Sequence, residues 1–359
     1  MRANRASEKK SYKKKIFLLL FIIVNISAIV IPAVLEFCGE NESLPFGDLL
    51  NIIGGNWYFL IAAIGCFGLA LFFESCKYDT MIYITTGKRQ FVTAFEVSAI
   101  GKYYDFITPF GSGGQPFQIY YLNKRGLPPG ASGALPVMGF LSNQIAFVLV
   151  TVAVFFTNAN VMKNVSDMNM LVPAYVGLIT YMIVPLLVIL FSVMPVTTQK
   201  IVAFFIRILG KMRIIKNVEN TIEKACGRLE EYNIHMRQMK KNKGLYLAIF
   251  FFSLLFQIAL NSIPFFVLCA FGVKTSFYDM FSLCAITYAA VSFVPTPGNG
   301  GAAEGMFMVI FRALSGGVLF WGMLIWRILS YYAFIVVGAM VTVVRSYLDK
   351  RKRQQITEE

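Results

Sequence analysis

Two short stretches place glycine, proline and polar side chains where the surrounding sequence is apolar. Residues 106–114 read FITPFGSGG and residues 293–301 read FVPTPGNGG, and the two align without gaps. A helix that restarts after such a break points free N–H groups and the positive end of its dipole at the break, which suits a phosphate or carboxylate. The stretches therefore predict one polar substrate site, around which we expect Thr108, Pro109, Ser112, Gly113, Gly114, Gln115, Thr296, Pro297, Asn299, Gly300 and Gly301.

The glycines add conformational freedom to each break. Gly113, Gly114, Gly300 and Gly301 are expected to adopt positive φ angles and to let a ligand approach the backbone closely. The alternative is that they only form the tip of a tight helical hairpin. The occurrence of the motif twice, in the manner of broken transporter helices, favours a substrate site.

Ionisable side chains within apolar segments are costly and are usually paired or functional. Glu304 lies three residues after the second pair of glycines, and Arg327 lies in the middle of the last apolar segment. We expect these two to pair, leaving Arg327 available to recruit a phosphate in another state. Lys102, Asp105 and Arg312 are secondary candidates. The first two could simply neutralise each other, and the arginine could extend to the membrane surface.

Composition indicates an all-α polytopic membrane protein. Hydrophobic residues make up 57% of the 359-residue chain and charged residues 14%, whereas soluble domains have about 25% charged residues. The formal net charge of +14 resides mainly at the ends of apolar segments, which favours topology signals and lipid contacts over nucleic acid. The six cysteines have no CxxC spacing and the chain has one histidine, so we expect neither a metal nor another cofactor.

Six apolar segments approach the roughly 20 residues that a bilayer crossing needs. They are residues 16–35, 57–73, 137–156, 171–194, 245–271 and 318–344. The first is longer than the apolar region of a signal peptide, which predicts an uncleaved helix. Lysine and arginine concentrate in residues 1–15, around Lys77, Lys88 and Arg89, in residues 195–244 and in the tail 346–359. Because such residues mark the cytoplasmic side, we expect a cell-membrane protein with both termini in the cytoplasm.

These orientations require the two glycine breaks to lie in re-entrant hairpins. Residues 91–125 would enter and leave from the inside, and residues 279–315 from the outside. The first membrane half, 16–194, and the second, 245–345, would then contain an inverted repeat, as in many secondary transporters. The alternative is that each half-hairpin is a short, tilted crossing.

The basic segment 195–244 is expected to contain amphipathic helices on the cytoplasmic side. Residues 200–216 place apolar side chains on one face and cations around it, which is typical of a helix on an anionic leaflet. The remainder mixes both signs of charge and could be a solvated connector.

At the glycine motifs the chain resembles a known family. YYDFITPFGSGGQPFQIYYLNKRGLP, FVPTPGNGGAAEGMF and WRILSYY are similar to the lysylphosphatidylglycerol synthase transmembrane-region family, the flippase-like half of the multiple peptide resistance factor. The resemblance covers nearly the whole chain. It implies handling of a phospholipid or aminoacyl-phospholipid, control of envelope charge and resistance to cationic peptides. It also leaves open a polyprenyl-linked or glycolipid substrate, because related regions accompany glycosyltransferases.

The sequence ends at Glu359, so we expect the acyltransferase domain of the full factor to be absent. No catalytic residues are identified in the cytoplasmic segments. We therefore predict a lipid translocase. The alternatives are a phosphatidylglycerol lysyltransferase, as the family name suggests, and a passive membrane partner of a separate synthase or glycosyltransferase. The sequence does not identify the headgroup, the direction of transport or the oligomeric state.

Overall fold

The computed structural model describes residues 19–34, 46–167, 169–212, 217–312 and 316–358, and this part of the chain contains helices and no strands. The expectation of an all-α protein is confirmed at this level. The basic N-terminus at residues 1–15 lies outside the described residues.

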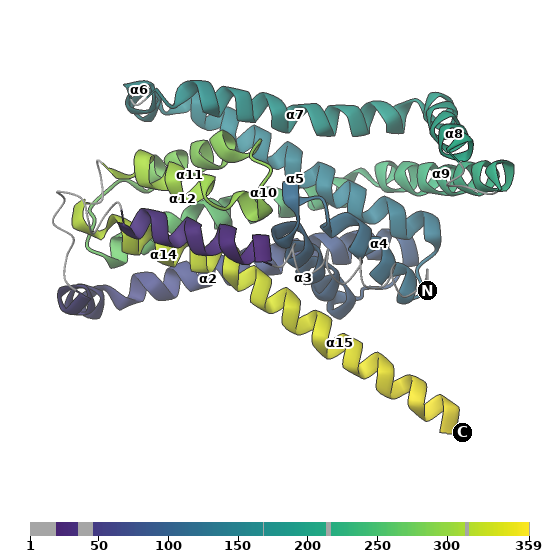
Figure 1. Cartoon of the computed structure of the whole chain (residues 1–359), viewed down its shortest axis with the longest axis horizontal. Coiled ribbons are helices and arrows are strands. Elements are labelled where there is room, and N and C mark those ends of the chain that lie inside the picture. Colours follow the sequence, from purple (N-terminus) through teal and green to yellow (C-terminus); the bar gives the residue numbers. More distant parts are fainter. Residues whose placement is uncertain (1–18, 35–45, 168, 213–216, 313–315, 359) are drawn as a thin grey trace.

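The helices follow one another with short connections (Figure 1). After a helix at residues 19–34 they are α2 (Phe46–Thr86), α3 (Phe91–Ile107), the 3₁₀ turn η1 (Pro109–Gly111), α4 (Gly114–Lys124), α5 (Pro129–Thr157), α6 (Ala159–Asp167), α7 (Leu171–Val193), α8 (Pro195–Lys211), α9 (Val218–Lys241), α10 (Lys243–Ala270), α11 (Phe277–Val291), the 3₁₀ turn η2 (Pro297–Asn299), α12 (Ala302–Ile310), η3 (Gly316–Val318), α14 (Leu319–Arg327), the π-helical turn η4 (Ile328–Tyr332) and α15 (Ala333–Glu358).

Four helical segments of the described chain are long and apolar enough to cross a membrane. They are Leu50–Thr86, Pro129–Thr157, Lys243–Ala270 and Leu319–Asp349, and each contains one of the predicted spans to within one residue. The other two predicted spans correspond to the shorter apolar helices Leu19–Val34 and Leu171–Leu187. The chain is therefore a polytopic α-helical membrane protein, and the count of six crossings stays a prediction.

Helix α2 continues well beyond the predicted span at 57–73 and ends only at Thr86. Lys77, which the sequence suggests as a cytoplasmic topology signal, is fully buried within this helix. Lys77 therefore lies within the helix and not in the connection that follows it, because its ammonium is paired with Glu74 one turn earlier. The cytoplasmic location of that connection stays a prediction. Pairing removes the cost that a lone buried ammonium would impose, so the charge does not end the helix.

The contacts between helices occur in equivalent pairs. Helix α2 packs along α10, and η1 packs against η2. Helix α3 contacts α15 just as α11 contacts α5, and the pairs α3 with α4 and α11 with α12 each pack together. These contacts pair each element of one half with a counterpart in the other.

Helices α6 to α9 form a more peripheral part of the chain. Helix α7 runs along one side of the molecule and α15 extends diagonally away from it (Figure 1). Helix α8 packs on α9, which in turn packs on α5. Phe204 and Phe205 of α8 are exposed. The segment predicted at 200–216 thus begins earlier, at Pro195, and residues 213–216 lie outside the described part.

Candidate functional site

The two glycine breaks lie against each other, although neither 3₁₀ turn contains a buried residue. The turn η1 lies against η2, and α3 also contacts η2. A hydrogen bond joins the first break to the last apolar segment, since the hydroxyl of Tyr331 donates to the backbone carbonyl of Phe106 at 3.2 Å. Tyr331 is fully buried, so this bond fixes the first break relative to the helix that carries Arg327.

Backbone conformation at the breaks differs from the sequence-based expectation. Of the four glycines expected at positive φ, only Gly301 has it, with φ of 84°. The expectation is wrong for Gly113 and Gly300, whose φ angles are −85° and −57°, and for Gly114, which begins α4. Positive φ occurs instead at Phe110, Gly111, Gly298 and Asn299.

Gly113 and Gly114 are required for close packing rather than for unusual backbone angles. A Cβ on Gly113 would lie 2.7 Å from the Thr108 side chain, and one on Gly114 would lie 2.3 Å from an Asp105 carboxylate oxygen. Both contacts are far inside van der Waals distance. The absence of side chains here lets two polar groups of the preceding helix reach the backbone of the restarting one.

Those two polar groups cap the start of α4. The Gly113 amide donates to the Thr108 hydroxyl oxygen at 2.8 Å, and that hydroxyl donates to the Tyr104 carbonyl at 2.7 Å. The Gly114 amide donates to Asp105 Oδ1 at 2.9 Å. The protein's own side chains therefore satisfy two amides that would otherwise face an anion at this helix start.

Replacing Thr108 with valine tests the cap at the first break. The substitution keeps the side-chain shape but removes both hydrogen bonds of the hydroxyl, leaving the Gly113 amide without its partner. We expect the free energy of unfolding to fall by about 1–2 kcal/mol, measured by equilibrium unfolding in mixed micelles. Ser112→Ala is the control, because that exposed hydroxyl donates only to the carbonyl of Pro109 in the same turn. An equal loss for both variants would contradict this role of Thr108.

The second break contains the ion pair expected from the sequence. Arg327 Nε donates to Glu304 Oε1 at 2.5 Å, and the two residues are 3% and 1% exposed. Arg327 Nη2 also donates to the Gly298 carbonyl at 2.7 Å, and the Gly301 amide donates to Glu304 Oε2 at 2.7 Å. The pair therefore holds both ends of the break, and the predicted pairing is confirmed.

Aromatic rings enclose the guanidinium of Arg327. Its central carbon lies 4.4 Å from the centroid of the Tyr331 ring and 5.8 Å from that of Trp326. Such stacking stabilises a cation away from water. Among the described residues, Nη1 of Arg327 has no hydrogen-bond partner. One face of the buried cation thus retains donor capacity for an anion.

The remaining predicted site residues differ in their exposure. Pro109 and Ser112 are exposed, whereas Gln115, Pro297 and Asn299 are half-buried. The half-buried Thr296 uses its hydroxyl to donate to the Gly300 carbonyl at 2.9 Å, so it braces the turn.

The three secondary candidates are not brought together in one group. Half-buried Asp105 caps α4, and Lys102 Nζ lies 4.4 Å from the centroid of the Phe256 ring. No ion pair joins Lys102 to Asp105 among the described residues. Arg312, at the end of α12, is exposed.

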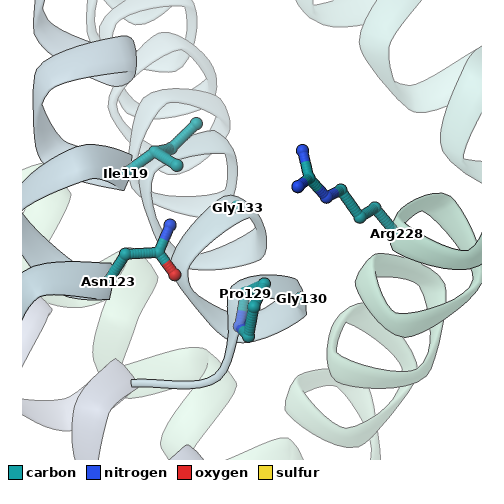
Figure 2. Close-up of a pocket in the computed structure, with 6 residues that line it drawn as sticks. All are labelled: Ile119, Asn123, Pro129, Gly130, Gly133 and Arg228. Carbon is teal, nitrogen blue, oxygen red and sulfur yellow. The ribbon is translucent and has the colours of Figure 1, made fainter. Parts of the chain in front are cut away.

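A separate cavity of about 420 Å³ lies between α4, α5 and the peripheral helix α9. Figure 2 shows Arg228 of α9 facing the start of α5 across the opening. The lining residues are Ile119, Asn123, Pro129, Gly130, Gly133 and Arg228. Neither break contributes a residue to the lining of this cavity, and Arg228 is the charged side chain in it. The cavity is therefore a poorer candidate for the substrate site than the region around Arg327.

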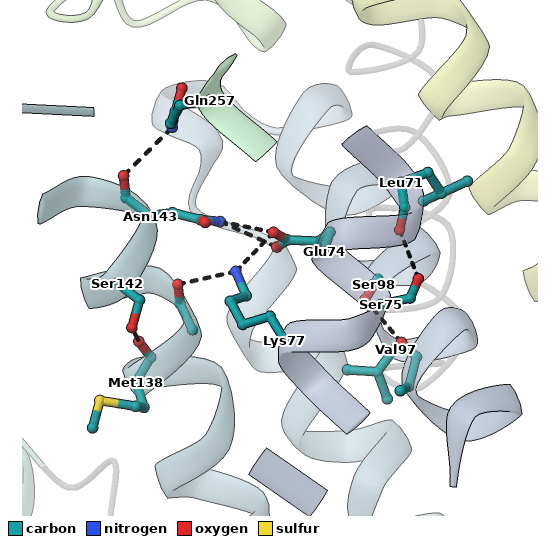
Figure 3. A network of polar contacts seen from close by, with 12 residues as sticks. Leu71, Glu74, Ser75, Lys77, Val97, Ser98, Met138, Ser142, Asn143 and Gln257 are labelled. Atoms are coloured by element: carbon teal, nitrogen blue, oxygen red, sulfur yellow. Dashed lines mark hydrogen bonds and ion pairs between the residues drawn. The ribbon is translucent and has the colours of Figure 1, made fainter. Parts of the chain in front are cut away.

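A second buried polar network was missed by the sequence analysis. Lys77 Nζ donates to Glu74 Oε2 at 2.7 Å and to the Gly139 carbonyl at 3.3 Å. The Asn143 amide donates to both carboxylate oxygens of Glu74 at 3.1 and 3.2 Å, and Gln257 donates weakly to the Asn143 carbonyl at 3.4 Å (Figure 3). The i, i+3 spacing of Glu74 and Lys77 was the available signal.

Comparison with known proteins identifies the family of this chain. The family model for the lysylphosphatidylglycerol synthase TM region matches residues 43–338, which include both glycine breaks, Glu304 and Arg327. The chain belongs to the lysylphosphatidylglycerol synthase transmembrane-region family. No curated protein matches the chain closely. Membership confirms the resemblance seen in the glycine motifs and associates the chain with lipid chemistry in a membrane.

Proposed function

We propose that this member of the lysylphosphatidylglycerol synthase transmembrane-region family is a lipid translocase. The headgroup of a phospholipid or aminoacyl-phospholipid, such as lysylphosphatidylglycerol, enters the polar region between the two breaks while its acyl chains stay in the bilayer. Movement of such a lipid in the cell membrane would change envelope charge and resistance to cationic peptides. The observation that carries the proposal is a buried arginine with spare donor capacity at the point where the two breaks meet.

Buried charge at this position favours binding over simple architecture. Glycine and proline are sufficient to form the tip of a hairpin, and an ion pair almost completely removed from water is not required there. Charged side chains within a membrane are expensive and typically mark substrate pathways. The phosphate of a lipid can take the place of Glu304 on Arg327 because guanidinium groups bind phosphates and carboxylates through the same fork of donors.

The membrane architecture that accompanies this proposal has six crossings and two re-entrant hairpins. Residues 91–125 enter from the cytoplasmic side and residues 279–315 from the outside, with both termini in the cytoplasm. The equivalent contacts of α3 with α15 and of α11 with α5 support an inverted repeat. Exchange of conformations between such halves would expose the site to each leaflet in turn.

The basic helix α8 would lie on the anionic cytoplasmic leaflet. Its exposed Phe204 and Phe205 supply the apolar contact, and Lys200, Arg207 and Lys211 supply the cations. Apolar burial and attraction to anionic lipids act together in such helices.

A liposome assay tests the function. Purified protein is reconstituted with headgroup-labelled phosphatidylglycerol, lysylphosphatidylglycerol, phosphatidylethanolamine or a polyprenyl phosphate, and leaflet exchange is measured. We expect exchange selective for one headgroup class and a loss of at least about tenfold in Arg327→Ala, Gly114→Leu and Gly301→Leu. Arg312→Ala is the matched control, because this exposed arginine lies in the same half and is expected to retain the wild-type rate.

Two other outcomes would replace the translocase proposal. Transfer of lysine from its tRNA to phosphatidylglycerol by the purified chain would identify a lysyltransferase. Wild-type exchange by all three folded variants, or no exchange by the wild type, would favour a passive partner. Co-purification with a lipid synthase or glycosyltransferase would then be the next measurement.

A further inference from the structure

A second group of buried and half-buried charges lies away from the breaks, where α3, α4 and α15 converge. Arg125 Nη2 donates to Glu96 Oε2 at 2.7 Å, and Arg345 donates to Glu96 Oε1 through both Nε and Nη2. The Tyr121 hydroxyl also donates to Glu96, and Arg125 Nε donates to that hydroxyl oxygen at 2.8 Å. One carboxylate thus serves two guanidinium groups and a phenol.

The charges in this group do not balance. Beside the Glu96 cluster, Lys124 pairs with Asp349, so the ion pairs of this group join three cations to two carboxylates among the described residues. The Asp349 carboxylate also attracts Arg125 and Arg345, and one positive charge remains in excess across the group. Two guanidinium groups held close together repel each other, and a single carboxylate offsets only part of that cost. An additional anion at this position is electrostatically favourable.

The two arginines also have the geometry to receive an anion. Each uses Nε and Nη2 for Glu96 or Tyr121, and Nη1 of each has no hydrogen-bond partner among the described residues. Their side chains are 29% and 26% exposed, whereas Glu96 is only 6% exposed. The two guanidinium groups are thus accessible to a ligand from outside, whereas their counter-ion lies buried beneath them.

We propose that Arg125 and Arg345 form a binding site for the phosphate of an anionic lipid, which binds through their free Nη1 groups while Glu96 stays in place as their internal counter-ion. The site lies at the C-terminal end of α4 and on the basic part of α15, at a boundary where lysine and arginine attract anionic headgroups. The phosphodiester of such a lipid has two non-bridging oxygens that share one negative charge, so it can accept a hydrogen bond from each of the two guanidinium groups. The proposal does not depend on translocation, because binding is measured without transport.

The test measures binding of fluorescent phosphatidylglycerol to the full chain in phosphatidylcholine nanodiscs, with labelled phosphatidylcholine as the reference. We expect Arg125→Gln and Arg345→Gln each to lose about tenfold of the preference for phosphatidylglycerol. Arg345→Lys is expected to lose part of it, because lysine keeps the charge but not the fork. Arg89→Gln is the matched control, since Arg89 pairs with Asp79 at 2.9 Å and, among the described residues, no second cation forms an ion pair with that carboxylate.

Glu96→Gln gives the decisive result. Because the Glu96 carboxylate offsets part of the charge on the two arginines, its neutralisation should strengthen phosphatidylglycerol binding by about threefold or more. If the cluster only joins α3 and α4 to α15, the same variant should weaken binding together with the arginine variants. The second result would overturn the proposal, as would equal binding of both lipids by the wild type. Melting temperatures of all variants identify any loss that comes from unfolding.

Inorganic phosphate, compared with chloride at equal ionic strength, distinguishes the possible sources of the ligand. Competition by inorganic phosphate would indicate a site that recognises the phosphate group alone. Binding of phosphatidylglycerol without such competition would indicate that the membrane-anchored headgroup is needed. Both results support an anion site at Arg125 and Arg345, whereas retention of lipid preference in the double variant Arg125→Gln/Arg345→Gln excludes it.

Discussion

Arg327→Met is expected to lower the free energy of unfolding by about 3–5 kcal/mol and to abolish lipid exchange. The substitution leaves the Glu304 carboxylate charged, 1% exposed and without its guanidinium partner. It also removes the hydrogen bond to the Gly298 carbonyl. Equilibrium unfolding in mixed micelles measures the first effect, and the liposome assay measures the second.

A double variant separates stability from function at this pair. The double variant Glu304→Gln/Arg327→Met leaves no buried charge at the position of this pair. The amide oxygen of the glutamine can still accept a hydrogen bond from the Gly301 amide. We expect the double variant to be more stable than Arg327→Met, with a coupling energy of about 2–3 kcal/mol. It should nevertheless remain inactive, because the cation that binds phosphate is gone. Recovery of exchange together with stability would show that the pair has only a structural role.

Gly298→Ala is expected to lower the free energy of unfolding by about 3 kcal/mol or more and to reduce the rate of lipid exchange strongly. Gly298 has φ of 57°, and a Cβ there would lie 1.9 Å from a ring carbon of Tyr331. The positive φ alone costs an L-residue about 1–2 kcal/mol. Because Tyr331 is fully buried, its ring cannot move aside without disturbing its hydrogen bond to Phe106 and its stacking on Arg327. Unfolding and exchange are measured as for Arg327.

Gly305→Ala is the matched control for this glycine. Gly305 lies in α12, a Cβ there meets nothing within 4 Å, and its φ is not positive. Alanine should be neutral or should stabilise the helix by up to about 1 kcal/mol. Tyr331→Leu in the Gly298→Ala background should recover part of the lost stability, because it removes the ring that clashes. A loss for Gly305→Ala as large as that for Gly298→Ala would contradict the steric explanation.

The apolar pattern predicted much of the helical framework. Four of the six expected spans coincide with long apolar helices, because a segment that must satisfy its backbone within a membrane has few alternatives to a helix. The positions of the two glycine breaks could also be predicted, since clustered glycine and proline residues favour the interruption of a helix. The C-terminal end of α2 could not be predicted from the sequence. Glu74 and Lys77 suggest the end of an apolar span when each charge is considered alone, but in the structure they neutralise each other within the helix.

The sequence by itself determined that this is an α-helical membrane chain with two related breaks, and it was sufficient to suggest that Glu304 pairs with Arg327. Only the tertiary structure decided which glycine needs positive φ, that Thr108 and Asp105 cap the first break, and that Glu96 is shared by two arginines. Helical periodicity and hydropathy are local properties, so one sequence contains them. The partners of a buried charge come from helices as far apart in sequence as α3 and α15, and packing alone brings them together.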